Sequence, residues 1–281
     1  MSRLSSLLVV LLVPMTLMAR APAEEPKREK GASEAERARH LERARAVAGS
    51  IRVLADSKRA ESAVKLKGEP VLRYADSTRQ AYESSLWIWS EGGRPAAILA
   101  VEYYPTGPTG PRWLYEIASL SEGLIAAERE GTFKFTAKEP GLLLKTLPDA
   151  PPPAEKEIRR LAQMKELRGR FTAYENATVN GRIELRPLVT PLLRYSDAKL
   201  DVLDGAIFAL ASGTNPEVLL VLEAHQLKGK SEWQYALVHM TGEAATVELD
   251  GKEVWQRKGD NPPAVRASYI NGYVEMAKEE K

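Results

Sequence analysis

Residues 70–102 read PVLRYADSTRQAYESSLWIWSEGGRPAAILAVE, and residues 191–223 read PLLRYSDAKLDVLDGAIFALASGTNPEVLLVLE. The two stretches align without a gap at an offset of 121 positions and share nine identities in 33 positions. Ordinary residue usage gives about two identities by chance. After a one-residue shift the similarity continues as far as Lys138 and Lys258. Because solenoid repeats have periods of only about 20–50 residues, the pattern predicts duplication of a whole domain.

The boundary between the two copies is predicted at residues 148–154, where three consecutive prolines make a stiff, extended linker. The first copy then covers residues 33–147 and the second covers residues 155–281. Residues 24–32 are polar and have no apolar periodicity, so we expect them to be disordered.

Each copy is predicted to begin with a helix and to continue as an antiparallel sheet. Ser33 and Glu36 have the spacing of a capping box at the start of the first helix. The strand-like segments that follow are joined by short turns such as Asp250–Gly251, which is typical of tight hairpins. Apolar periodicity over residues 265–274 indicates a C-terminal helix in the second copy. The sequence thus predicts an α+β fold: a tandem duplication of a helix plus antiparallel β-meander module, curved or rolled into a partial barrel.

The start of the chain has the pattern of a secretory signal. Arg3 precedes an apolar run, and Ala21 and Ala23 are the small residues expected before a cleavage site. The run is shorter than the roughly 20 residues of a spanning helix, and Pro14 interrupts it. We therefore expect a signal peptide over residues 1–23, cleavage after Ala23 and a secreted or periplasmic protein without a transmembrane segment.

Composition excludes several classes of function. Removal of Arg3 and Arg20 with the signal leaves 38 of the 40 basic residues against 38 acidic residues, and this neutral balance argues against nucleic acid as a partner. The absence of cysteine excludes disulfides, thiolate metal sites and a cysteine nucleophile. The sequence contains no serine-nucleophile motif or glycine-rich phosphate loop. We therefore assign no cofactor.

Four residues are candidates for catalysis. His225 and His239 lie on two predicted strands joined by residues 226–232, and Glu223 shares a strand face with His225. Such a group could bind a metal or act as a general base. Polar residues also pair commonly near hairpin loops, and two histidines with one glutamate do not define a metal site, so no metal is assigned. Glu102 occupies the position of Glu223 in the first copy.

The repeated Arg-Tyr-x-Asp unit supplies candidates for binding. Arginine and aspartate could pair with each other at a strand end while tyrosine packs in the core, a structural role that both copies would need. Ligand binding is the alternative. Trp113 with Tyr115, and Trp233 with Tyr235, alternate along a predicted strand and place two aromatic side chains on one face. Such pairs are more typical of a core or an interface between copies than of a sugar or base platform. The binding candidates are Arg73, Tyr74, Asp76, Arg194, Tyr195, Asp197, Trp113 and Trp233.

The stretch from Pro191 to Ala224 resembles a segment of a family of uncharacterised exported bacterial proteins. The resemblance covers about the second half of the chain. The first half departs from it at residues 82–89, where bulky side chains replace the turn at residues 204–206. The resemblance implies export and a β-rich fold, and it implies no catalytic activity.

Two classes of function follow from the sequence. The first is an exported, non-enzymatic binding or structural module for a protein partner, an envelope component or an apolar ligand. We favour it because apolar and aromatic patterns are rich, whereas acids, bases and nucleophiles are poorly clustered. The alternative is a secreted or periplasmic hydrolase whose glutamate and histidine residues converge in the fold. Convergent polar groups around a cavity would indicate the hydrolase, and an apolar groove would indicate the binding module.

Overall fold

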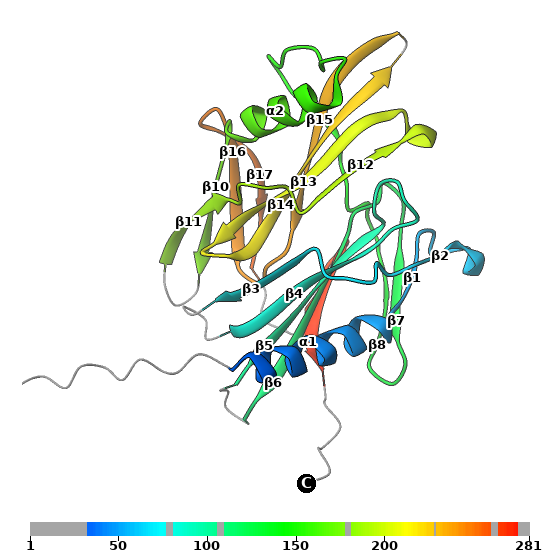
Figure 1. Cartoon of the computed structure of the whole chain (residues 1–281), viewed down its shortest axis with the longest axis vertical. Coiled ribbons are helices and arrows are strands. Elements are labelled where there is room, and N and C mark those ends of the chain that lie inside the picture. The colour runs from blue at the N-terminus through cyan, green and yellow to red at the C-terminus, as the bar shows by residue number, and fades with distance from the viewer. Residues whose placement is uncertain are drawn as a thin grey trace, which may run out of the picture. The chain divides into compact units, whose positions relative to one another are not determined.

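The computed structural model contains two α-helices and nineteen β-strands in the residues that it describes, and residues 32–281 form one compact unit (Figure 1). The expected signal peptide and the expected disordered segment, residues 1–32, lie outside the described residues. The described residues are 33–76, 81–105, 110–177, 181–227, 229–259 and 264–274.

The fold is β-rich, so the predicted α+β class, a tandem of helix-plus-meander modules, is wrong. Helix α1 (Glu34–Gly49) and helix α2 (Glu157–Arg168) are the only α-helices among the described residues, and curled antiparallel sheets form most of the remainder. The strands are more numerous and longer than the sequence pattern indicated. They also do not fall into two self-contained meanders.

A six-stranded antiparallel sheet has the order β18-β19-β6-β5-β4-β3. Its strands are β3 (Leu72–Asp76), β4 (Ala81–Trp89), β5 (Ala97–Tyr104), β6 (Arg112–Ser119), β18 (Ala264–Val265) and β19 (Tyr269–Val274). A four-stranded sheet has the order β2-β1-β7-β8. Its strands are β1 (Arg52–Leu54), β2 (Ala63–Val64), β7 (Ala126–Arg129) and β8 (Phe133–Thr136).

A nine-stranded sheet has the order β17-β16-β10-β11-β13-β14-β15-β9, with β12 also paired to β13. Strands β9 to β12 are Lys145–Thr146, Phe171–Ala177, Gly181–Pro187 and Leu193–Asp197. Strands β13 to β17 are Val202–Ser212, Asn215–Leu227, Lys230–His239, Ala244–Leu249 and Lys252–Arg257. Two 3₁₀ turns, Ala60–Ser62 and Ala198–Leu200, complete the regular structure of the described residues.

Local signals in the sequence account for several element boundaries. Ser33 and Glu36 make both bonds of the predicted capping box: the Glu36 N–H donates to Ser33 Oγ at 3.3 Å, and the Ser33 N–H donates to Glu36 Oε2 at 2.6 Å. Asp250 and Gly251 adopt positive φ angles of 51° and 76° and close the predicted hairpin between β16 and β17. These short-range predictions are confirmed.

The central strands are covered on both faces. Trp87 and Leu99 pack in a core cluster with α1, whereas Leu86 and Ile98 point to the opposite face of the same sheet. That opposite face packs against Leu219 and its neighbours in the nine-stranded sheet, whose other face packs on α2. Alternation of side chains along each strand therefore serves two cores, which explains the nearly continuous apolar runs in these strands.

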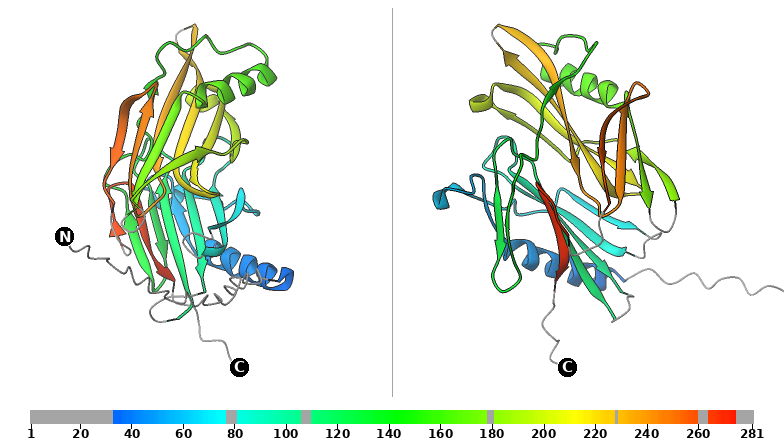
Figure 2. Two further views of the ribbon diagram at one scale, coloured as in Figure 1. Left: turned by 90° about the vertical axis from the view of Figure 1, so that its left-hand side faces the viewer. Right: turned by 180° about the vertical axis from the view of Figure 1, so that it is seen from behind.

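The last strand of each half pairs with the sheet of the other half. Strand β9 precedes α2 in the chain but pairs with β15, and β19, near the C-terminus, pairs with β6 (Figure 2, red strand among the blue-green strands). Residues 264–265 and 269–274 therefore form strands, and the predicted C-terminal helix is wrong. Tyr269 and Ile270 are buried in different core clusters, on opposite faces of the sheet. Neighbouring residues point to opposite faces in a strand, whereas an amphipathic helix would bury its apolar residues on one face.

Candidate functional site

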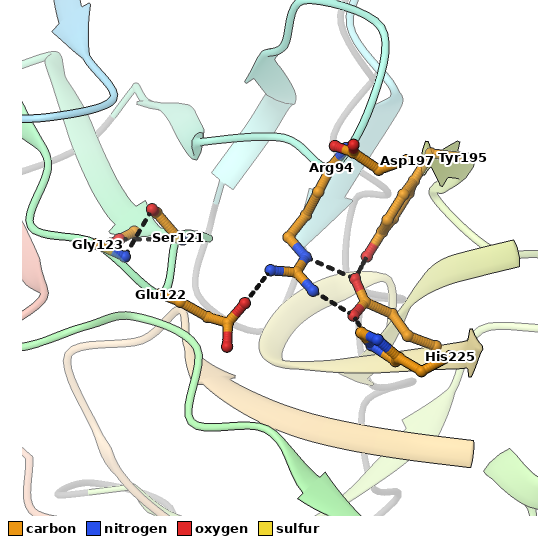
Figure 3. Close-up of polar contacts among 9 residues, drawn as sticks. Arg94, Ser121, Glu122, Gly123, Tyr195, Asp197 and His225 are labelled. Atoms are coloured by element: carbon orange, nitrogen blue, oxygen red, sulfur yellow. Dashed lines mark hydrogen bonds and ion pairs between the residues drawn. The ribbon is translucent and has the colours of Figure 1, made fainter. Parts of the chain in front are cut away.

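A buried carboxylate links the two halves of the chain. Glu223 lies on β14 with a fully buried side chain, and the loop between β4 and β5 brings Arg94 to it (Figure 3). Arg94 Nε donates to Glu223 Oε1 at 2.7 Å, and Arg94 Nη2 donates to Oε2 at 2.6 Å. The Tyr195 hydroxyl donates to Oε1 at 2.6 Å, and His225 Nε2 lies 2.8 Å from Oε2. Both oxygens of the carboxylate are therefore bonded by side chains of the protein itself.

These contacts set the charge of the cluster. Burial alone would raise the pKa of the Glu223 carboxyl, but hydrogen bonds from His225 and Arg94, with the positive charge of Arg94, lower it to about 2. Burial and the charge of Glu223 raise the pKa of the Tyr195 hydroxyl well above its ordinary value. At neutral pH Glu223 is thus an anion and Tyr195 a neutral phenol. Neither has the pKa near neutrality that efficient general acid–base catalysis needs.

The loop that carries Arg94 is held at its backbone as well. The Arg94 N–H donates to Asp197 Oδ2 at 3.1 Å, and Arg94 Nη1 also binds the carboxylate of Glu122 (Figure 3). A Cβ atom on Gly93 would lie 2.1 Å from Asp197 Oδ2, so only glycine permits this approach. Burial alone would lower the pKa of the Arg94 guanidinium, but Glu223 and Glu122 raise it. The bond to Asp197 and the two bonds to Glu223 therefore fix the loop to the second half, and the bond to Glu122 holds it to the first.

The first half contains a related group. The Tyr74 hydroxyl donates to Glu102 Oε1 at 2.8 Å, and the Tyr104 hydroxyl donates to Glu102 Oε2 at 2.6 Å. In both halves the tyrosine of the repeated unit bonds a glutamate 28 positions later. Tyr74, Glu102, Tyr195 and Glu223 are all candidates from the sequence, and their common spacing is the signal that could have predicted the pairing. Arg94 carries no such signal, because the repeat places Asn215 at that position.

The arginines of the repeated unit pair across strands, so the predicted ion pair within each unit is wrong. Arg73 Nε and Nη2 donate to Glu83 Oε1 at 2.9 and 2.8 Å. Arg194 donates to both oxygens of Asp204 at 2.9 and 2.6 Å, and Arg160 of α2 donates to the same carboxylate at 3.0 Å. Successive strand residues point to opposite faces, so an arginine and an aspartate three positions apart on a strand do not face each other. These residues brace strand pairs and one helix.

The predicted histidine cluster is also wrong. Strands β14 and β15 pair up to Leu227 and Lys230, which places His225 opposite Glu232 and His239 opposite Val218. The two histidines therefore lie seven positions apart along the ladder, or about 23 Å at about 3.3 Å per residue. His239 instead contacts the guanidinium of Arg266, and its Nε2 lies 2.9 Å from the carbonyl oxygen of Glu243.

Both candidate tryptophans are core residues. Trp113 is 2% exposed and Trp233 is 1% exposed, which leaves no ring face for a sugar or base. Trp113 packs in an aromatic group with Tyr103 and with His40 of α1, whose ring centroid lies 4.2 Å from that of Tyr103. Burial lowers the pKa of the His40 imidazole.

An open groove lies between β15 and β17, where the two ends of the nine-stranded sheet approach each other. Its volume is about 380 Å³. The segment before β9 forms one side of it and carries Leu143, a leucine that is 56% exposed. Lys145 Nζ reaches across to the carbonyl oxygen of Val254 at 3.4 Å. The lining is mixed. Leu143 and Trp255 are apolar or aromatic, and the side chains of Tyr235 and Leu237 below them are buried. The remaining lining includes the polar or charged residues Lys145, Glu253, Gln256 and Arg257.

The described residues show neither a metal site nor a membrane-spanning helix. No group of three or more histidine, aspartate or glutamate residues in this part of the chain is placed to hold a metal ion. None of the helices in the same part of the chain has the length and apolar character to span a membrane.

Comparisons with protein-family models, with characterised proteins and with solved structures gave no match.

Proposed function

We propose that the mature chain is an exported, non-enzymatic binding module and that the groove between β15 and β17 is its binding site. One observation carries the proposal: the conspicuous buried polar groups are bonded to each other, whereas the groove is an open concavity in which Leu143 is 56% exposed. Ligand sites are typically concave and combine apolar side chains with a few polar groups. Export rests on the signal pattern at Arg3, Ala21 and Ala23.

The geometry argues against the hydrolase alternative. Arg94, Tyr195 and His225 occupy the oxygens of Glu223, so this carboxylate has no free position for substrate or water. His239, the second candidate base, lies at the opposite end of the same strand pair. Catalysis by these residues would require the link between the two halves to open.

Native mass spectrometry tests the proposal. The chain beginning at Glu24 would be purified from its native compartment and weighed before and after denaturation. We expect a co-purifying mass that denaturation removes. Leu143→Arg should abolish it because Leu143 lines the groove and is 56% exposed. Leu200→Arg is the matched control, since Leu200 is 42% exposed and does not line the groove.

Two results would overturn the proposal. One is a bound mass that Leu143→Arg and Leu200→Arg leave equally unchanged, which would move binding away from the groove. The other is turnover of an ester, amide or glycoside substrate that Glu223→Gln abolishes without unfolding the chain. That result would assign catalysis to the buried cluster.

A further inference from the structure

In the six-stranded sheet, β19 pairs with the outer edge of β6. Ile270 of β19 pairs with Ile117, and Gly272 pairs with Tyr115. The hydrogen bonding continues past the end of β19, because the Ser119 N–H donates to the carbonyl oxygen of Ser268 at 3.0 Å. The outer edge of β6 is therefore covered along the length that β19 spans.

The corresponding edge of β15 is covered only in part. Strand β9 pairs Lys145 with Tyr235 and Thr146 with Gln234, and the ladder then stops. Because the Leu147 N–H donates to the carbonyl oxygen of Trp233 at 2.8 Å, alternation directs the backbone groups of Tyr235 and Leu237 to the same outer edge. In the part of the chain that the structure describes, no backbone hydrogen bond reaches Leu237 from that side.

The chain leaves this edge for a definable reason. The N–H groups of Gly141 and Leu142 donate to the carbonyl oxygen of Ser121 at 2.9 and 3.0 Å, which holds the segment before β9 against the first half. Leu142 is buried in the core between the two large sheets. Leu143, which would face Leu237 if β9 were longer, lies exposed at the side of the groove instead.

Strand β17 has a second edge without a strand partner among the described residues, and it faces the first across the groove, where the Lys145 side chain bonds the carbonyl oxygen of Val254. The Asp250 N–H donates to the carbonyl oxygen of Arg170 at 3.0 Å, on the side of β16 that faces β10. Because backbone groups alternate between the two sides of a strand, those of Val247 point toward β17. Val247 pairs with Trp255, and the backbone groups of Gln256 therefore point away from β16. Strand β17 ends the sheet, and its Gln256 and the Leu237 edge of β15 line the same groove.

We propose that this groove binds an extended segment of a partner polypeptide, which is added as a strand between β15 and β17. The inference rests on the proposed function and names the class of ligand. Open strand edges present backbone donors and acceptors in a row, and an added strand satisfies them through its own backbone. Alternate side chains of the segment would lie against Leu143 and Trp255, which favours apolar residues at every second position.

The charges at the rim refine the ligand. Lys145 and Arg257 outnumber Glu253 among the charged residues that line the groove. A segment with a neutral or slightly acidic character fits this balance. Proline at its centre would remove a backbone donor and is excluded by the same pairing.

Peptide selection tests the inference directly. A library of random 12-residue peptides would be selected against the chain beginning at Glu24, and binding of the chosen peptides would be measured by fluorescence anisotropy. We expect alternating apolar residues in the selected peptides. Central proline and the variant Leu143→Arg should each weaken binding at least tenfold, whereas Leu200→Arg should leave it unchanged. Amide hydrogen exchange at Leu237 and Gln256 should slow when the peptide binds.

The outcomes separate this inference from the proposed function. If no peptide is selected, or if selected peptides tolerate central proline or Leu143→Arg, strand addition is overturned. If native mass spectrometry still shows a small apolar mass that Leu143→Arg removes, the binding module stands with a different ligand. If neither peptides nor a co-purifying mass bind at the groove, both proposals fall.

Discussion

Replacement of Arg94 by methionine tests the link between the two halves. The substitution keeps an unbranched side chain of similar length but leaves Glu223 buried without its guanidinium partner. Removal of one member of a buried ion pair typically costs about 3–5 kcal/mol. The lowered pKa of Glu223 leads to a similar free energy. A carboxyl whose pKa falls from 4.5 to about 2 on folding contributes about 3 kcal/mol to stability. We expect Arg94→Met to lower the free energy of unfolding by about 3–5 kcal/mol.

Urea unfolding at pH 7.5, followed by tryptophan fluorescence, measures this change. Arg59→Met is the matched control, because it removes an arginine from its pair with Glu61, in which both side chains are exposed, at 65% and 69%. Such exposed pairs contribute less than about 1 kcal/mol. If Arg94→Met costs no more than Arg59→Met, the cluster does not hold the halves together and the reasoning fails.

The pH dependence supplies a second check on the same residue. Because the pKa of Glu223 is depressed in the folded state, its contribution to stability is complete above pH 4.5 and is lost as the pH falls through about 2. In Arg94→Met the pKa of Glu223 in the folded state should rise, so the acid-dependent part of the stability shrinks. The free energy of unfolding would be measured from pH 2 to 7 for the parent chain and for Arg94→Met. The same dependence on pH in both proteins would contradict this assignment.

Three further changes test the packing. Tyr195→Phe removes the hydroxyl that bonds Glu223 and should cost about 1.5–3 kcal/mol in urea unfolding, whereas Tyr273→Phe, at a 40% exposed tyrosine, should change little; equal effects would refute the role of the buried bond. Gly205→Ala places a Cβ atom 2.7 Å from Tyr195 Cε2 and should lower stability by about 1–3 kcal/mol, so an unchanged melting temperature would contradict the close packing. Ile270→Ala should cost about 2–5 kcal/mol and speed amide exchange at its partner Ile117, and protection retained there would argue against β19 as part of this sheet.

Local features of the fold could be predicted because neighbouring residues decide them. The Ser33–Glu36 cap and the Asp250–Gly251 turn each depend on a few adjacent side chains and on backbone angles that those residues favour. The prediction that His225 and His239 lie close together was wrong, although it also concerned a single hairpin. The sequence predicts that residues 226–232 join the two strands, whereas β14 continues to Leu227 and β15 begins at Lys230.

The candidate site could be predicted only in pieces. The repeat drew attention to Tyr195 and Glu223, and the structure shows them bonded to each other. Arg94 lies 129 positions before Glu223 and has no counterpart in the repeat, so no pattern in the sequence marked it. The groove depends on where β9 stops and on the curl of a nine-stranded sheet, and neither is a property of any short stretch.

The sequence by itself determined the alternation that makes strands, the caps and turns that bound them, and the matched tyrosine–glutamate spacing in the two halves. These features follow from local conformational preference and from side chains that must be buried. Only the tertiary structure decided that β9 and β19 cross to the opposite sheets, that Arg94 binds Glu223, and that two strand edges remain open at one groove. The physical reason is that pairing between distant segments is selected by the packing of the whole core, and a strand's own residues specify its faces but not its neighbour.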